Sequence, residues 1–291
     1  MAATVSVLGL GNMGAALADA LIGAGHAVTV WNRGAERRAA FAGRCAVQDD
    51  PAEACAASDL VIACLADYAA TDAVLAAPGV AAALRGRTLV QLATAGPGEA
   101  QALAETLAAA GVALLDGKIL TYPARIGDAP TMLAYAGERA LWERHRPVLL
   151  ALGGASALVA EEPGGATAVD LAWLSFLYGS TLGLLQGAAF CEAGGVDPAA
   201  AFAAVPSWLV EIAAEAEYAR GLIARRDYRG DQASLDVHVA AMEHIVGSAN
   251  ASGVSDAFPR LHVDLFSQAV ARGHGAEEIA AGIEVLRPPA S

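Results

Sequence analysis

Gly164-Gly165-Ala166-Thr167-Ala168-Val169-Asp170 opens the stretch around which this chain is organised, and the stretch continues through Tyr178 to residue 190. No charged residue occurs in 171–190, so the Asp170 carboxylate stands at the entrance of an apolar run. The sequence before it alternates between strand-like and helix-like patterns, and the sequence after it is helical. These patterns predict a long buried helix that joins two domains, with its ionisable residues facing a substrate.

Length and charge set the first limits. A chain of 291 residues is long enough to form two hydrophobic cores. We expect a first domain over 1–163, the long helix over 164–195 and a helical domain over 196–291. The formal net charge of −13 favours solubility and argues against nucleic acid or an anionic membrane as a partner.

The apolar run 171–190 has an alternative interpretation as a membrane span, because about 20 apolar residues cross a bilayer. However, the run contains Ser175, Tyr178 and Gln186 together with three glycines, and it has no flanking basic anchors. A helix that is apolar on all sides but too polar for lipid is usually buried in protein. We therefore predict a buried helix, with a second subunit as part of its cover.

The cysteines and the N-terminus indicate a cytoplasmic protein. The four cysteines have no paired metal-ligand spacing, and free thiols are typical of a reducing compartment. The first residues have no basic segment and lead directly into a strand, so no signal peptide is expected. The six histidines also lack ligand spacing, and no metal site is predicted.

A glycine motif follows the first predicted strand, at 4–8. Gly9-Leu10-Gly11-Asn12-Met13-Gly14 then leads into a helical pattern. Such glycines give a tight turn, close approach of a pyrophosphate to the backbone, and close packing of helix on strand. The motif alone could be a structural turn. Its position between an N-terminal strand and a helix, where free N–H groups meet phosphates, favours a dinucleotide site.

The end of the second strand, at 27–31, indicates which dinucleotide binds. NAD sites usually place Asp or Glu there for the ribose hydroxyls, whereas this chain has Asn32 and Arg33, with Arg37 one helical turn later. A solvated basic loop would have the same composition. Guanidinium groups at this position of an acidic chain suit a 2′-phosphate, so we predict NADPH.

The remaining pattern predicts an α/β domain with a mostly parallel, doubly wound sheet of the Rossmann type, followed by an all-α domain. Further strands are expected at 60–65, 88–92, 112–115, 131–135 and 156–160, with helices at 99–109 and 139–152 among them. Ligands bind where such strands end. We therefore place Leu65, Ala66 and Thr94 beside the cofactor. Lys118 follows another strand, where a lysine is more often a solvated charge than a catalytic group.

Asp170 has two interpretations. Thr167 and Asp170 form a Thr-x-x-Asp pattern, which suits a capping box at a helix start, where an acid also benefits from the helix dipole. Alternatively, Asp170 faces the reacting substrate, because the first turns of this helix follow the last strand of the nucleotide domain. Tyr178 lies eight residues later, about 12 Å along a helix axis, and a small substrate fits between the two. We favour the second interpretation.

The second half of the chain predicts helices. Asp197-Pro198 is an N-cap followed by proline at the first helical position, and helices follow at about 206–224, 233–251, 257–272 and 276–286. Trp208 and His238 are the residues here that we assign to a substrate pocket. A core tryptophan and a hydrogen-bonded core histidine are the alternative interpretations.

Taken in order, these motifs resemble the imine reductases and reductive aminases, which are related to the 3-hydroxyacid dehydrogenases. The resemblance covers essentially the whole chain. It rests on Gly9-Leu10-Gly11-Asn12-Met13-Gly14, Trp31-Asn32-Arg33, Leu115-Asp116-Gly117-Lys118-Ile119 with Pro123 and Ile126-Gly127, Asp170 with Tyr178, and Gly273-His274-Gly275.

The resemblance also implies what the site has lost relative to the hydroxyacid enzymes. Those relatives carry a catalytic Lys where this chain has Asp170, an Asn pair where it has Trp173-Leu174, and a carboxylate-binding Ser-Gly-Gly where it has Leu120-Thr121-Tyr122. An acid beside an apolar pocket, to which we also assign Thr94, Thr121, Tyr122 and Trp173, suits a substrate that becomes a cation.

The family therefore implies reduction of imines by NADPH, with Asp170 and Tyr178 as catalytic residues and a domain-swapped homodimer built on the long helix. Thr94 stands where reductive aminases often have Asn, which leaves open whether the chain also joins a ketone to an amine. Two other functions remain as alternatives. One is an NADP-dependent 3-hydroxyacid or other carbonyl dehydrogenase, and the other is a non-catalytic NADPH-binding sensor or scaffold.

Overall fold

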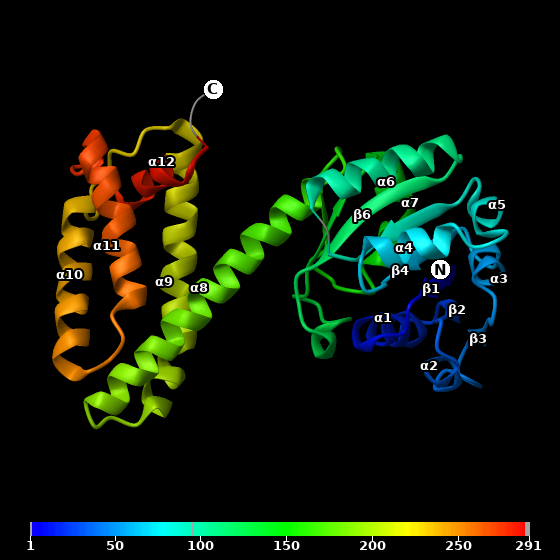
Figure 1. Cartoon of the computed structure of the whole chain (residues 1–291), viewed down its shortest axis with the longest axis horizontal. Coiled ribbons are helices and arrows are strands. Elements are labelled where there is room, and N and C mark those ends of the chain that lie inside the picture. The colour runs from blue at the N-terminus through cyan, green and yellow to red at the C-terminus, as the bar shows by residue number, and fades with distance from the viewer. Residues whose placement is uncertain (1, 95, 289–291) are drawn as a thin grey trace. The chain divides into compact units, whose positions relative to one another are not determined.

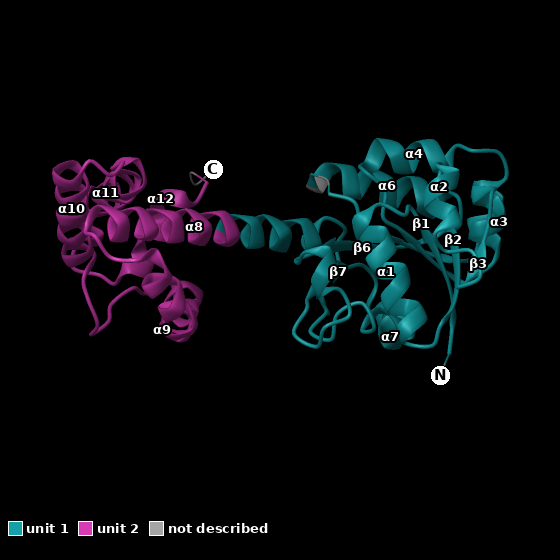
Figure 2. Ribbon diagram, turned by 90° about the horizontal axis from the view of Figure 1, so that it is seen from below, with its two compact units in different colours: residues 1–175 teal, residues 176–291 magenta. Residues whose placement is uncertain are grey.

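The structure, a computed structural model, describes residues 2–94 and 96–288. The chain divides into two compact units, Met1–Ser175 and Phe176–Ser291, coloured separately in Figure 2. The division falls inside one helix, α8 (Gly165–Ala193), which occupies most of the 164–195 stretch predicted as a separate helix.

Unit 1 contains an eight-stranded sheet. The strands are β1 (Thr4–Leu8), β2 (Ala27–Trp31), β3 (Ala46–Val47), β4 (Leu60–Ala63), β5 (Thr88–Gln91), β6 (Ala113–Ile119), β7 (Leu133–Ala136) and β8 (Ala157–Ala160). Their order is β3-β2-β1-β4-β5-β6-β7-β8, and every pair is parallel except β6 with β7. The predicted mostly parallel sheet is confirmed.

Helices cover both faces of this sheet (Figure 1). They are α1 (Asn12–Gly23), α2 (Ala35–Ala39), α3 (Pro51–Ala56), α4 (Tyr68–Leu75), α5 (Val80–Leu84), α6 (Pro97–Ala109) and α7 (Arg139–Leu149), with a 3₁₀ turn at Pro123–Arg125. One buried cluster joins α1 and α7 to the sheet through residues such as Leu17 and Trp142. A second cluster packs α3, α4, α5 and α6 against the sheet through residues such as Tyr68 and Leu103. This two-sided core is what a doubly wound sheet requires.

The long helix α8 is buried only near its start in the single chain. Only Ala166, Thr167 and Asp170 of its 29 residues are buried, so within one chain the helix is not enclosed by protein. By length and composition alone, both α8 and α9 (Pro198–Arg225) are apolar enough to cross a membrane. The prediction of a buried helix included a second subunit as part of its cover, so burial of the whole helix stays a prediction.

Unit 2 is helical, as predicted, and consists of the rest of α8, α9, α10 (Leu235–Ser252), α11 (Ala257–Ala269) and short turns at Val270–His274, Ile279–Gly282 and α12 (Ile283–Leu286). Asp197 caps α9 by accepting a hydrogen bond from the Ala199 amide at 2.9 Å. The predicted break at 206 is wrong, because α9 continues through Pro206.

The predicted helix at 276–286 is also wrong over its first half. The Glu278 amide donates to the Tyr228 carbonyl at 2.9 Å, and the buried Glu278 carboxylate accepts from the Gln232 amide at 2.7 Å. These bonds hold residues 276–278 against the loop after α9. The Glu278 amide therefore bonds to that loop instead of to a helical turn, and a regular helix begins only later.

Candidate active site

The glycine loop between β1 and α1 is built for close approach. Gly9 has a φ of +99°, and a Cβ there would lie 2.3 Å from the Cys64 carbonyl oxygen. A Cβ on Gly14 would lie 1.9 Å from the Gly9 carbonyl oxygen, so both positions require glycine. At Gly11 the nearest atom is 3.7 Å away, which leaves the backbone open to a ligand. The loop and the start of α1 therefore fit a pyrophosphate.

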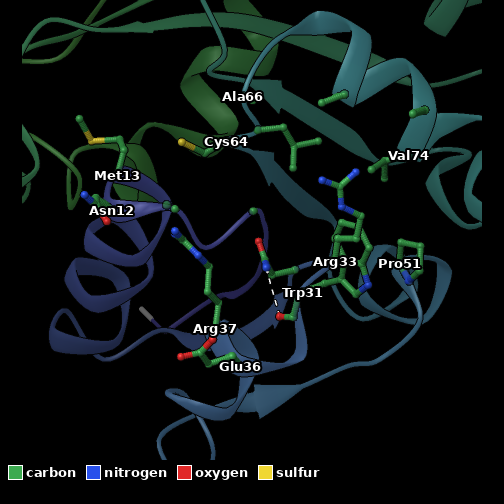
Figure 3. Close-up of a pocket in the computed structure, with 18 of the residues that line it drawn as sticks. Asn12, Met13, Trp31, Arg33, Glu36, Arg37, Pro51, Cys64, Ala66 and Val74 are labelled. Carbon is green, nitrogen blue, oxygen red and sulfur yellow. Dashed lines mark hydrogen bonds between the residues drawn. The ribbon is translucent and has the colours of Figure 1, made fainter.

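A cavity of about 870 Å³ opens beside this loop (Figure 3). Ten of the predicted cofactor residues line it: Gly9, Gly11, Asn12, Met13, Gly14, Asn32, Arg33, Arg37, Leu65 and Ala66. Leu10 and Thr94 do not line it. Leu10 is buried, and Thr94 is exposed after β5.

The residues after β2 have different roles, because some fix the loop and others extend into the cavity. Asn32 accepts a hydrogen bond from the Leu10 amide at 3.0 Å and donates one to the Gly34 carbonyl at 3.2 Å, so its amide fixes the loop. Arg33 and Arg37 extend into the cavity (Figure 3), and Arg37 also donates to the Leu10 carbonyl at 2.8 Å. Glu36 lines the cavity as well, so the arginines leave one net positive charge there.

Sequence reasoning missed the opposite wall of the cavity. Ala70, Ala73, Val74 and Ala77 line it, and all four belong to α4 or the turn that follows it. Their spacing places them on one helical face. A small-residue stripe directly after a strand-end loop was the available signal. This wall is apolar, which suits the face of a purine ring.

A second cluster of functional groups lies on β6. Asp116 and Lys118 are two residues apart and share one face of the sheet, and both are buried. The Lys118 Nζ lies 2.5 Å from the Asp116 Oδ1, which also accepts a hydrogen bond from the Tyr68 hydroxyl at 3.0 Å. The Gly164 amide donates to the Asp116 Oδ2 at 3.3 Å.

The prediction of a solvated Lys118 in a loop was wrong. β6 continues to Ile119 because β7 returns antiparallel beside it, pairing Lys118 with Ala134. The strand therefore carries Lys118 into the interior, where Asp116 compensates its charge.

Asp170 lies close to this cluster, near the start of α8. The helix begins at Gly165, so Thr167 is its third residue and its hydroxyl is buried without a hydrogen bond. The capping-box interpretation was therefore wrong. A Cβ on Gly165 would lie 2.2 Å from that of Ala160, and this glycine contact lets the helix begin earlier than the threonine suggests.

Asp170 as a whole residue is 7% exposed, and among the described residues its side chain makes no hydrogen bond. Burial raises the pKa of Asp170 above its ordinary value, the Lys118 ammonium opposes that rise, and the Asp116 carboxylate adds to it. The Asp116 carboxylate thus accepts hydrogen bonds from three donors, whereas the Asp170 carboxylate remains available to a ligand.

The other predicted residues differ in their exposure. Tyr178 lies eight residues further along α8 and is 68% exposed, and Trp208 is exposed on α9. Trp173, Thr121 and His238 are partly buried, and Tyr122 is exposed. Their assignment to a substrate pocket stays a prediction. Within 2–94 and 96–288, no group of three His, Cys, Asp or Glu side chains is placed to hold a metal ion.

Known proteins match this chain over nearly its whole length. The family model "NAD binding domain of 6-phosphogluconate dehydrogenase" matches residues 4–160, and "NADPH-dependent reductive aminase-like, C-terminal domain" matches residues 162–288. The NADPH-dependent reductive aminase of Aspergillus oryzae is 28% identical over 291 residues, which cover 99% of this chain and 98% of that protein.

Two solved structures extend the comparison. The imine reductase from Myxococcus stipitatus in complex with NADP+ is 30% identical, with a TM-score of 0.88 over 98% of this chain and 100% of that one. The reductive aminase from Aspergillus terreus in complex with NADPH and ethyl levulinate is 29% identical, with a TM-score of 0.87 over 99% and 100%. The chain therefore belongs to the imine reductase and reductive aminase family.

Proposed function

We propose that the chain reduces C=N bonds to amines with NADPH, and that its substrates include imines formed from a ketone and an amine. The observation that carries the proposal is the Asp170 carboxylate, which is buried beside the Asp116–Lys118 pair yet has no hydrogen bond of its own among the described residues. Relatives over the full chain length are named for this chemistry.

The cavity beside the glycine loop would hold the cofactor. The backbone at Gly11 would meet the pyrophosphate, the alanine face of α4 would cover the adenine, and Arg33 and Arg37 would meet the 2′-phosphate. When bound, NADPH supplies a hydride to the carbon of the C=N bond.

Asp170 would act as the general acid. Because burial raises its pKa, a larger fraction of this carboxyl stays protonated near neutral pH than for a solvated aspartate. Proton transfer to the imine nitrogen gives an iminium, which accepts hydride far more readily. The carboxylate left behind stabilises that cation electrostatically in a site with few competing dipoles. Tyr178, on the same helix, would orient the nitrogen.

The carboxylate also argues against the dehydrogenase alternative. A 3-hydroxyacid carries its own negative charge, and the Asp170 and Asp116 carboxylates would repel it, with Lys118 already paired at 2.5 Å. A non-catalytic NADPH sensor would need no buried acid of this kind. The dehydrogenase alternative predicts that 3-hydroxyacids reduce NADP. The sensor alternative predicts tight NADPH binding without turnover.

We also propose that the chain works as a domain-swapped homodimer in the cytoplasm. What supports the dimer is a row of exposed side chains on α8, namely Leu171, Tyr178, Leu182 and Leu185, which recur at heptad-like spacing. Lipid is a poorer cover, because α9 carries Glu211, Glu215 and Glu217 within its length. The described cysteines are all free, as a reducing compartment favours.

Absorbance of NADPH tests the activity. Oxidation with a cyclic imine, and with a ketone plus excess amine, is expected. Asp170→Asn and Tyr178→Phe should each lower kcat on the order of a hundredfold, with little change in NADPH affinity by fluorescence titration. Asp72→Asn, which makes the same charge change on the exposed face of α4, should leave kcat unchanged. Full turnover in both active-site variants would overturn the assignment.

A further inference from the structure

Lys118 is the only lysine in the 291-residue chain, and every other basic residue apart from the histidines is arginine. This lysine is 1% exposed and lies on β6 inside unit 1. A chain that otherwise uses arginine for its cations thus has one compact ammonium group, and that group is buried. A guanidinium is larger and needs a planar set of acceptors, so arginine does not fit the same purpose.

The partners of Lys118 are fixed. Its Nζ lies 2.5 Å from the Asp116 Oδ1 and 3.3 Å from the Gly117 carbonyl oxygen, and 5.7 Å from the centre of the Tyr68 ring. Asp116 in turn accepts from Tyr68 and from the Gly164 amide. Tyr68 comes from α4, the helix that lines the cofactor cavity, and Gly164 directly precedes α8, which carries Asp170.

The charges in this cluster do not balance. The cluster holds two buried carboxylates, Asp116 and Asp170, and one buried ammonium, Lys118, which among the described residues forms an ion pair with Asp116 alone. The neighbouring strand β7 adds only Ala134 and Ala136 on this face, where they pack against Ala166 of α8. Burial raises the pKa of the Tyr68 hydroxyl, which therefore stays neutral. In such surroundings one charge has a strong effect on another.

The two carboxyl groups differ in the hydrogen bonds that they accept. Asp116 accepts hydrogen bonds from Lys118, the Tyr68 hydroxyl and the Gly164 amide, whereas Asp170 has no such donor among the described residues. Asp170 is therefore the carboxyl of this cluster that is available to exchange a proton with a substrate.

We propose that Lys118 is a positioning residue for catalysis: its buried ammonium, on the face of the sheet that the first turns of α8 cover, acts electrostatically on the Asp170 carboxyl and tunes it for proton transfer. The inference rests on the proposed role of Asp170 as general acid. Burial and the Asp116 carboxylate raise the pKa of Asp170, and the Lys118 ammonium opposes that rise. Proton transfer is most effective when the pKa of the acid lies near the working pH.

The sign of the effect follows directly. If the protonated Asp170 is the active form, the rate falls as the pH rises through its pKa. Removing the Lys118 charge raises that pKa, so Lys118→Met should move the alkaline limb of the kcat/KM profile to higher pH by about one unit or more.

Asp116→Asn/Lys118→Met is the matched variant. It removes both charges, whose effects on Asp170 oppose each other, so its alkaline limb should lie closer to that of the unchanged enzyme than the limb of Lys118→Met does. It also avoids leaving an unpaired anion in the interior, which threatens the folding of the single variant. A purely structural role for Lys118 would lower the rate in these variants without moving the limb.

The unchanged enzyme allows a second test that needs no variant of Lys118. Because the chain has one lysine, protein labelled with ¹³Cε-lysine gives one side-chain NMR signal. That signal should shift as Asp170 titrates, and the inflection should be absent in Asp170→Asn but present in Asp72→Asn. No inflection in the unchanged enzyme, or the same inflection in Asp170→Asn, would overturn the proposal. Because this signal is independent of turnover, an enzyme inactive on imines would refute the proposed function and leave this coupling measurable.

Discussion

Each polar or basic side chain after β2 has either a structural or a ligand-binding role. Asn32 and Arg38 are both engaged with the protein: Asn32 joins the loop to Leu10, and Arg38 pairs with Asp49 at 2.6 Å. Arg33 and Arg37 line the cavity and keep donors free. The sequence predicted a basic site here correctly as a group, but it could not divide the group, because that division depends on which backbone carbonyls lie nearby.

Arg33→Ala and Arg37→Ala are expected to weaken NADPH binding by about tenfold to a hundredfold each, because each removes charge-assisted hydrogen bonds to a phosphate. NADH lacks the 2′-phosphate, so its affinity should change little. Fluorescence titration with both cofactors measures the difference. Arg44→Ala is the matched control, since Arg44 pairs with Asp19 on the surface away from the cavity. An equal loss for NADPH and NADH would show that these arginines only shape the loop.

Lys118 shows what a sequence leaves undecided for one residue. Its burial depends on the antiparallel return of β7, whose pairing with β6 spans the loop between Ile119 and Leu133. Nothing in the local pattern of a single strand records that return. The available clue was compositional: a lone lysine in an arginine-rich chain marks a position where the two cations are not equivalent.

At the scale of whole elements, strong local patterns were decisive. β1 and β2 occupy the predicted residues, because short apolar runs between glycines admit few other structures. The two-residue strand β3 gave no pattern to recognise. In unit 2, the prediction broke a helix at Pro206, where the helix continues, and it placed a helix over 276–278, where none forms. An exposed helix accepted a proline, and tertiary hydrogen bonds to Glu278 replaced a helical turn.

The start of α8 yields a prediction at this scale. Gly165→Ala should destabilise the protein by about 1–3 kcal/mol, because the new methyl group would overlap with the Ala160 methyl group. Ala160→Gly in the same chain should recover most of that loss, since it removes the opposing methyl group. Gly247→Ala on α10, where nothing lies within 4 Å, should be neutral or stabilising. Urea unfolding measures all four proteins, and a double variant no better than the single one would contradict the contact.

At the scale of the molecule, the chain exposes more apolar surface than a monomer needs. α9 carries exposed Phe202, Leu209 and Ile212, and α8 carries the row that includes Tyr178. Surfaces of this kind mark interfaces. The sequence predicted that α8 needs a cover, but a single-chain pattern cannot tell a neighbouring domain from a second copy. Burial of Tyr178 by a partner would also give it the dry surroundings that its proposed role requires.

Leu185→Glu should therefore weaken the proposed dimer by at least about thirtyfold, the effect of one interface hot spot, because the carboxylate would be buried without a partner. Light scattering after size-exclusion chromatography, over a dilution series, measures the dissociation constant. Imine turnover should fall with the monomer fraction, while NADPH binding to unit 1 should remain, since that cavity is complete within unit 1. Leu286→Glu changes an equally apolar, exposed leucine outside the row and should remain dimeric. A monomeric unchanged protein with full turnover would mean that α8 needs no second copy, and sedimentation of the chain with membranes would identify lipid as its cover.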